Sequence, residues 1–298
     1  MSNKTIAVVG TGNMGHAVGC TLRHHGSRVI TALNGRSDRS CHLAELAGIE
    51  DKGDVTTLIS EADIVLSILP PKAAVAFAGE IASAMVSSGK SPTFVDCNAV
   101  SPESAQAIAQ LFLDTDAAFV DVGIVGGPPG KNSVPRFYAS GPDVQLITVL
   151  NGMGIEVKDM GGAIGDASAL KMCYASVTKG TLALHTAVLI AAERLGLSLP
   201  LIAEFELSQP IVLESMRTRV PWLATDAERW IREMDEIAAT FTSVGVPAGF
   251  HEGAADIYKL LSSTKLAEET REHRDKSRNL DQAVSIFADA IMYHPAAE

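Results

Sequence analysis

The chain has 298 residues, of which 47% are hydrophobic and 20% charged. This length and composition exclude a disordered or fibrous protein and allow two domains of ordinary size. Its 24 Lys and Arg residues against 35 Asp and Glu give a formal net charge of -11. A surface of that sign repels phosphate backbones, so we expect no nucleic acid partner.

Cysteine content and apolar run lengths indicate the compartment. Cys20, Cys41, Cys97 and Cys173 form no C-x-x-C pair and have no histidine at metal-ligand spacing. They are typical of free thiols in a reducing compartment, and we predict no metal site. The first apolar run is too short for a secretory signal, and the stretch 182–192 is well short of a bilayer span. We therefore expect a soluble cytoplasmic protein with no membrane partner.

Short apolar runs alternate with helix-like segments in the first half of the chain. The runs at 6–9, 28–33, 64–69, 93–97 and 119–125 are typical of a mostly parallel sheet built from βαβ units. After about Gly165 these runs stop, and helical patterns cover 166–196, 228–244, 251–261 and 280–292. The glycine-rich turn 160–165 predicts the boundary. We expect a doubly wound α/β domain over residues 1–162 and an all-helical domain over 163–298.

The strongest local motif is a G-x-G-x-x-G run made by Gly10, Gly12 and Gly15, between a predicted strand and a predicted helix. Gly10 allows a tight turn, Gly12 lets the backbone approach a pyrophosphate, and Gly15 lets the helix pack on the sheet. Asn13 and Met14 supply amides at the helix start, which attract an anion. The motif predicts a dinucleotide-binding Rossmann domain. A glycine-rich turn without a ligand is the alternative.

The residues after the second predicted strand distinguish NADP from NAD. A carboxylate at this strand end would bind a ribose 2′-hydroxyl, but none is present there. Asn34, Arg36 and Ser37 follow instead, and Arg36 with Ser37 could hold a 2′-phosphate. We therefore predict NADP(H) in preference to NAD(H). A solvated loop arginine is the alternative, since Asp38 lies in the same loop.

Lys171 is the candidate catalytic residue. It shares one face of the long predicted helix with Tyr174, Ala175 and Thr178. A lysine whose pKa is lowered by burial can transfer a proton in catalysis. An exposed lysine at the domain boundary is the alternative interpretation.

The glycine- and proline-rich run 121–130 ends a predicted strand at the edge where doubly wound sheets bind ligands. Free amides at Val125, Gly126 and Gly127 could hold a carboxylate or an oxyanion of a small-molecule substrate. A rigid turn with no ligand is the alternative.

The predicted helix over 168–195 would be about 40 Å long. It is apolar around most of its circumference in the segment 183–191. Such a helix is buried on several sides, which favours a homodimer through the C-terminal helices.

These motifs, in this order and spacing, resemble the β-hydroxyacid dehydrogenase family, which includes 3-hydroxyisobutyrate and 6-phosphogluconate dehydrogenases and is related to imine reductases. The resemblance covers nearly the whole chain and is firmest at residues 10–15, 69–71, 95–98, 121–127 and 165–171. The second half looks more like a little-characterised branch of phosphogluconate-dehydrogenase-like proteins, for which no substrate is assigned.

The resemblance implies hydride transfer to or from a nicotinamide, and a dimer joined through the long helix. Lys171 matches the catalytic lysine, the base that takes the substrate hydroxyl proton during oxidation. Asn98 matches a polar position beside the nicotinamide, and Leu69 with Pro70 matches the loop that lines it.

Two polar substrate contacts of the family are missing. Val125 stands where the family has a serine, and Ala175 stands where it has an asparagine. Tyr174 and Lys179 are candidate replacements, and Arg232 roughly matches a later lysine of the family. We therefore expect a substrate that is bulkier or less polar than 3-hydroxyisobutyrate.

The sequence thus predicts an NADP-preferring oxidoreductase that interconverts a hydroxy compound and its carbonyl product. One alternative is an imine or iminium reductase with the same cofactor cleft, although imine reductases usually lack a lysine at position 171. The other is a non-catalytic NADP-binding protein, suggested by Val125 and Ala175.

Overall fold

The computed structural model describes residues 4–271 and 273–291. The chain divides into two compact units, residues 1–174 and 175–298. This division falls inside helix α6 (Asp166–Arg194), about three turns beyond the position 162/163 expected from the sequence.

The first unit contains an eight-stranded sheet with the order β3-β2-β1-β4-β5-β6-β7-β8. The six strands from β3 to β6 are parallel, β7 is antiparallel to β6, and β8 is parallel to β7. This is the predicted doubly wound Rossmann sheet. The strands are β1 (Thr5–Val9), β2 (Arg28–Thr31), β3 (Glu50–Asp51), β4 (Ile64–Ser67), β5 (Thr93–Asp96), β6 (Phe119–Val125), β7 (Arg136–Ser140) and β8 (Glu156–Gly161).

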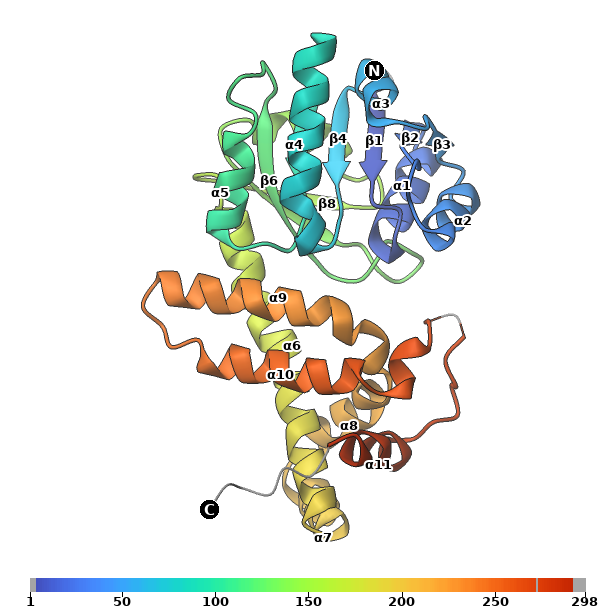
Figure 1. Cartoon of the computed structure of the whole chain (residues 1–298), viewed down its shortest axis with the longest axis vertical. Coiled ribbons are helices and arrows are strands. Elements are labelled where there is room, and N and C mark those ends of the chain that lie inside the picture. Colours follow the sequence, from blue (N-terminus) through green and yellow to red (C-terminus); the bar gives the residue numbers. More distant parts are fainter. Residues whose placement is uncertain (1–3, 272, 292–298) are drawn as a thin grey trace. The chain divides into compact units, whose positions relative to one another are not determined.

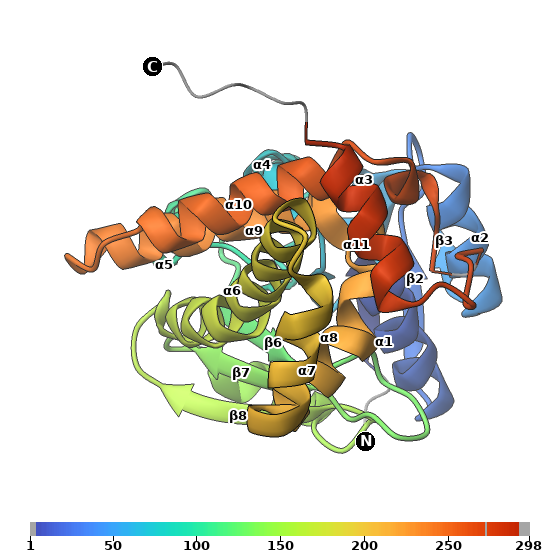
Figure 2. The same ribbon diagram turned by 90° about the horizontal axis from the view of Figure 1, so that it is seen from below.

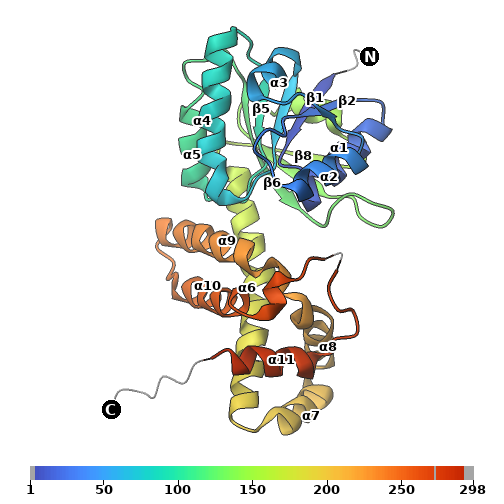
Figure 3. The same cartoon turned by 45° about the vertical axis from the view of Figure 1, so that its right-hand side comes forward.

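Apolar side chains on both faces of the sheet anchor the surrounding helices. Val18 and Leu22 of α1 belong to one buried cluster, and Phe77 and Ile81 of α4 belong to another. Helices α4 and α5 lie side by side over one face (Figures 1 and 3). The helical elements of this unit are α1 (Asn13–His24), α2 (Asp38–Leu46), α3 (Val55–Glu61), α4 (Pro71–Ser88), α5 (Pro102–Gln110), the 3₁₀ helix η1 (Val144–Leu150) and the start of α6.

All five predicted strands form, but three end earlier than expected, β5 by a single residue. β2 ends at Thr31 because the Leu33 amide donates to a side chain, Asp51 Oδ1, at 3.0 Å. β4 ends at Ser67, and the amide of Leu69 donates to Asn98 Oδ1 at 2.6 Å. Side chains thus replace strand pairing at this edge. Strands β3, β7 and β8 were not predicted.

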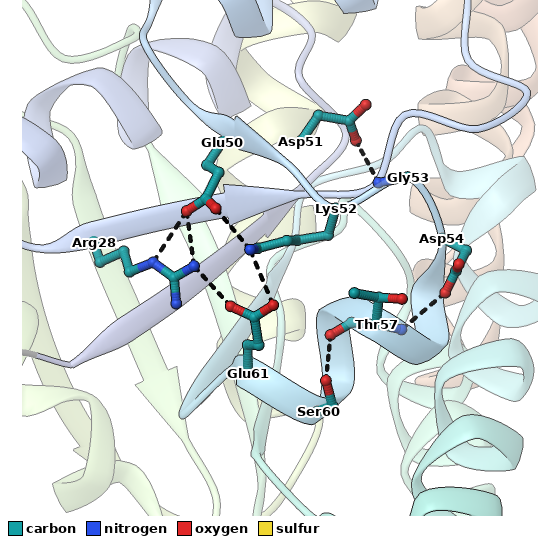
Figure 4. A network of polar contacts seen from close by, with 9 residues as sticks. All are labelled: Arg28, Glu50, Asp51, Lys52, Gly53, Asp54, Thr57, Ser60 and Glu61. Carbon is teal, nitrogen blue, oxygen red and sulfur yellow. Dashed lines mark hydrogen bonds and ion pairs between the residues drawn. The ribbon is translucent and has the colours of Figure 1, made fainter.

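Four charged side chains hold the two-residue strand β3 to its neighbours (Figure 4). Arg28 bonds Glu50 at 2.8 Å and Glu61 at 2.7 Å, and Lys52 bonds the same two carboxylates at 2.6 and 2.9 Å. Hydrogen bonds from Lys52 and then Arg28 lower the pKa of both glutamates. The alternating charges link β2, β3 and α3 at a point where backbone pairing is sparse.

The described residues of the second unit form the predicted helical domain. Helices α9 and α10 run side by side (Figures 1 and 2). Beyond the end part of α6, the elements are α7 (Ser198–Ser208), α8 (Pro210–Arg219), η2 (Val220–Trp222), α9 (Ala224–Ser243), α10 (Gly249–Ser262), η3 (Lys265–Glu268) and α11 (Leu280–Asp289). Helices α7 and α8 were not predicted. The end of the predicted helix 280–292 lies partly outside the described residues.

Helix α6 is continuous over 29 residues, as its sequence pattern predicts. Its length and composition alone would suffice to cross a bilayer, but half of its most apolar window is buried inside the protein. Core helices of soluble proteins have the same properties, so this is weak evidence for a membrane span.

Candidate functional site

Most of the predicted site residues lie at one edge of the sheet. β1, β4, β5 and β6 are parallel neighbours in that order, so the segments that follow them lie side by side. These segments contain the glycine motif, Leu69 with Pro70, Asn98, and Gly126 with Gly127. Ligands of doubly wound sheets bind at this edge, beyond the carboxyl ends of the strands.

The three glycines of the motif are required for different reasons. A Cβ on Gly10, whose φ is +89°, would lie 2.3 Å from the carbonyl oxygen of Ile68, and one on Gly15 would lie 2.1 Å from that of Gly10. Gly12 has an ordinary φ of -76°, and a Cβ there would meet nothing within 4 Å. The protein's own packing therefore explains Gly10 and Gly15, whereas Gly12 borders open space.

The N-terminus of α1 lies at this space, and no acidic or capping side chain offsets its partial positive charge. The first turn, which contains Asn13 and Met14, has no acidic residue and no side-chain cap. Arg39 of α2 donates to Asn13 Oδ1 at 2.6 Å and brings a positive charge to the same end. The open space, the uncapped amides and the arginine fit the pyrophosphate of a dinucleotide.

The segment after β2 holds the residues expected to select the cofactor. The Arg36 guanidinium lies 5.5 Å from the ring centroid of Phe77, which orients it. Ser37 caps α2 by accepting a hydrogen bond from the amide of Ser40, and Asn34 is exposed beside this loop. Arg36 and Asn34 thus present polar groups at this edge of the sheet, while the hydroxyl of Ser37 is engaged by the helix it begins.

One expectation at this position needs correction, because an acidic residue does lie at the end of β2. Asp51, from β3, accepts hydrogen bonds from the amides of Leu33 and Gly53 at 3.0 and 2.8 Å. It is distant in sequence from the β2 end and reaches it only because β3 pairs with β2. The only sign of this carboxylate in the sequence is that Asp51 lies two residues before Gly53.

Asn98 joins the ends of β4 and β5. Its Oδ1 accepts from the Leu69 amide at 2.6 Å, and its Nδ2 donates to Ser67 Oγ and to Asp96 Oδ1. The side chain is 3% exposed. These three contacts occupy the side-chain amide of Asn98. Asn98 therefore positions the Leu69–Pro70 loop through its bond to the Leu69 amide.

A buried carboxylate on β6 holds the start of α6. Asp121 Oδ2 accepts from the amides of Gly165 and Ser168, each at 3.0 Å, and from Ser140 Oγ at 3.1 Å. Its Oδ1 accepts from Ser168 Oγ at 2.7 Å. Burial raises the pKa of this carboxyl, although all four hydrogen bonds favour the charged form. Asp121 thus caps the helix that contains Lys171.

Gly123, two residues further along β6, lets α6 approach the sheet closely. A Cβ there would lie 2.5 Å from the carbonyl oxygen of Ala167 and 2.9 Å from Lys171 Cβ. At this separation Lys171 Nζ donates to the carbonyl oxygen of Ile124 at 2.6 Å. The ammonium group is therefore held near the carboxyl end of β6, half-buried rather than solvated.

The end of β6 leads into the expected substrate-binding run. Val125 is buried, whereas Gly126 and Gly127 are exposed. Gly126 adopts a φ of +117°, which favours glycine. The exposed backbone of this turn directly follows β6, the strand whose Ile124 carbonyl oxygen accepts the hydrogen bond from Lys171 Nζ.

The remaining predicted residues have other surroundings. Tyr174, at the end of the first unit, is 45% exposed. In the second unit the Lys179 ammonium forms a buried ion pair with Glu233, so its charge is neutralised within the protein. Arg232 is exposed and lies 3.5 Å from Asp235 on the same helix. No group of His, Cys, Asp and Glu among the described residues could hold a metal ion.

Comparison with known families assigns the first unit. Residues 5–160 match the NAD binding domain of 6-phosphogluconate dehydrogenase, which is more than half of the chain. The chain belongs to this family. Residues 192–261 match a domain of unknown function, DUF1932.

Curated relatives of this family member match over part of their length. An uncharacterized 28.5 kDa protein of Methanothermus fervidus is 29% identical over 57% of this chain and 63% of its own length. The mitochondrial 3-hydroxyisobutyrate dehydrogenase of Drosophila melanogaster is 26% identical over 57% of this chain and 52% of its own. The chain thus spans less than two thirds of the curated relatives it matches.

Solved structures share the fold of both units. The conserved protein MTH1747, of unknown function and described as similar to 3-hydroxyacid dehydrogenases, is 28% identical with a TM-score of 0.64, over 86% of this chain and 96% of its own. Structures of 3-hydroxyisobutyrate dehydrogenases and of imine reductases or reductive aminases share the fold at 15 to 18% identity, with TM-scores of 0.52 to 0.66. By family and fold, the protein is a member of the β-hydroxyacid dehydrogenase-like group.

The close approach at Gly123 yields a test. We expect Gly123→Ala to destabilise the protein by about 1–3 kcal/mol, because the added Cβ pushes α6 away from β6. Gly79→Ala is the matched control, since a Cβ at this α4 position meets nothing within 4 Å and helix propensity predicts a gain of about 0.5–1 kcal/mol. Urea unfolding measures both, and equal stabilities for the two variants would contradict the packing argument.

Proposed function

We propose that the protein is an NADP-preferring oxidoreductase that interconverts a hydroxy compound of the β-hydroxyacid type and its carbonyl product. The observation that carries this proposal is the position of Lys171 Nζ, bound to the carbonyl oxygen of Ile124 at the carboxyl end of β6. The glycine motif and the Leu69–Pro70 loop lie at the same edge of the sheet. A proton-transfer group and a dinucleotide cradle are therefore neighbours on one scaffold.

The chain's residues divide into those that hold the cofactor and those that act on the substrate. Gly10, Gly12 and Gly15 with the first amides of α1 would hold the pyrophosphate, Arg36 the 2′-phosphate, and Leu69 with Pro70 the nicotinamide end. When bound, the nicotinamide cofactor accepts or supplies the hydride.

Lys171 would transfer the proton that accompanies the hydride. In oxidation its amine takes the proton of the substrate hydroxyl, and in reduction its ammonium returns a proton to the carbonyl oxygen. The bond to the Ile124 carbonyl oxygen holds Nζ at the carboxyl end of β6. The backbone of Gly126 and Gly127 would orient the substrate beside it.

The role of Lys171 predicts a selective loss of turnover. Lys171→Met should reduce the turnover of a hydroxyacid by about 100-fold or more, because general acid–base assistance is lost, while NADPH affinity stays unchanged. Lys90→Met, in an exposed loop, is the control. Steady-state assays of a panel of β-hydroxyacids and one cyclic imine measure the effect. Undiminished turnover in Lys171→Met, or turnover of the imine alone, would contradict the assignment.

The cofactor preference predicts a difference between two titrations. Fluorescence titration should give tighter binding of NADPH than of NADH, and Arg36→Ala should weaken NADPH binding by about 10-fold or more through loss of a charge-assisted hydrogen bond. Asp51→Asn keeps the oxygen that accepts the Leu33 and Gly53 amides but removes the charge, so it should tighten NADPH binding. Tighter binding of NADH by the unaltered protein would contradict the preference.

We further propose a homodimer through the C-terminal helices. No residue of α7 is buried, and Leu199, Leu207 and Ile211 of α7 and α8 are 84 to 86% exposed. Exposed leucine and isoleucine in such a cluster favour burial against another subunit.

The four free cysteines favour a reducing compartment, so we place the protein in the cytoplasm.

The dimer predicts a change in sedimentation. The unaltered protein should sediment as a dimer at micromolar concentration, and Leu207→Lys should shift it toward the monomer because the charge cannot be buried in an apolar contact. A compact monomer without any substitution would contradict the proposal.

A further inference from the structure

Arg136 begins β7 and pairs across the sheet with Val125, the last residue of β6. The sequence pattern does not predict this strand, so it gives no reason to single out Arg136. The side chain is half-buried, and among the described residues its guanidinium has no hydrogen bond or ion pair. An arginine in this condition is unusual, since burial removes part of its hydration without a replacement.

The register of β6 and β7 determines the face on which Arg136 lies. Asp121 and Gly123 point toward α6, as their contacts with Ser168 and Lys171 show. Side chains alternate along a strand, so Val125 points the same way. Directly opposed residues of an antiparallel pair share a face, so Arg136 also lies on the α6 side.

The contacts of Ser140 support this assignment independently. Ser140 is opposite Asp121, is four residues from Arg136 on the same strand, and its hydroxyl donates to Asp121 Oδ2 at 3.1 Å. Burial along β7 also alternates, with Phe137 and Ala139 in the apolar core on the other face. Arg136 and Lys171 therefore lie on one face, at the end of β6.

Nearby acidic groups on this face are already engaged. Asp121 accepts four hydrogen bonds from Ser140 and the start of α6. Glu156, which is in register with Arg136 on β8, bonds Lys158 at 2.5 Å. Two cationic side chains thus lie on the same face at the end of β6, in a protein with a formal net charge of -11. A guanidinium placed in this way matches a planar, negatively charged ligand.

We propose that Arg136 binds the anionic group of the substrate, a carboxylate or a phosphate, beside Lys171. This inference rests on the proposed oxidoreductase function and defines its substrate class. Arg136 lies directly opposite Val125, the position where the resemblance implies a lost serine contact. The polar contact is therefore supplied from the neighbouring strand, and by a charged group. The substrate is a hydroxy compound with an anionic group, not the less polar molecule expected from Val125 alone.

Calorimetric titration of the NADPH-saturated protein tests this proposal. The probes are 3-hydroxypropionate, its neutral amide, and glycerol 3-phosphate. An alcohol does not react with a reduced cofactor, so the heat measures binding alone. The variants are Arg136→Leu, Arg136→Lys, and Lys131→Ala, the last in the exposed loop of the same hairpin. Thermal unfolding and a separate NADPH titration show that each variant is folded.

The unaltered protein should bind one of the two anions more tightly than the amide, and the preferred anion distinguishes carboxylate from phosphate. Arg136→Leu should weaken that binding by roughly 10- to 100-fold, Arg136→Lys by less, and Lys131→Ala not at all. Equal binding by Arg136→Leu and the unaltered protein, equal losses in Arg136→Leu and Lys131→Ala, or equal affinity for the amide would each overturn the proposal.

The cofactor titration separates this inference from the function on which it rests. A protein that binds NADPH but none of the three probes would overturn the substrate class and leave the oxidoreductase proposal intact. A protein that binds no NADPH would overturn the oxidoreductase proposal itself.

Discussion

The hydrogen bonds received by the buried Asp121 carboxylate determine the geometry of the candidate site. One carboxylate on β6 satisfies two amides and a hydroxyl at the start of α6 and a second hydroxyl on β7. Each of these donors would be costly to bury without a partner. The sheet and the long helix are therefore joined at a defined register, and Lys171 lies one and a half turns further along that helix.

Glycines allow the neighbouring helices and strands to approach one another closely in this register. Gly123 removes the side chain that would separate α6 from β6, and Gly10 and Gly15 do the same between β1, β4 and α1. Gly12 differs because no protein atom occupies the space its side chain would fill. The same residue type thus serves internal packing at three positions and borders open space at the fourth. Only the coordinates of neighbouring atoms distinguish the two uses.

Charge is distributed unevenly over the acidic chain. The acidic side chains at the β3 edge are balanced by Arg28 and Lys52, and in the helical unit Glu233 pairs with Lys179. Arg136 and Lys171 both lie on the α6 side of the sheet, where Asp121 and Glu156 already have partners. A net negative protein can therefore offer a local site for an anion, because the field of a few placed cations acts within about one Debye length.

The sequence by itself determined the local elements and their class: the βαβ rhythm, the glycine motif, the long helix 166–194 and Lys171 on it are all periodic or contiguous patterns. It did not determine β7 and β8, which contain charged and polar residues among their apolar ones and are stabilised by neighbouring strands rather than by propensity. Asp51 and Arg136 reach the edge of the sheet through strand pairing alone. Tertiary structure decided these positions, because strand pairing brings together residues that are far apart in the sequence, and no local sequence pattern predicts that contact.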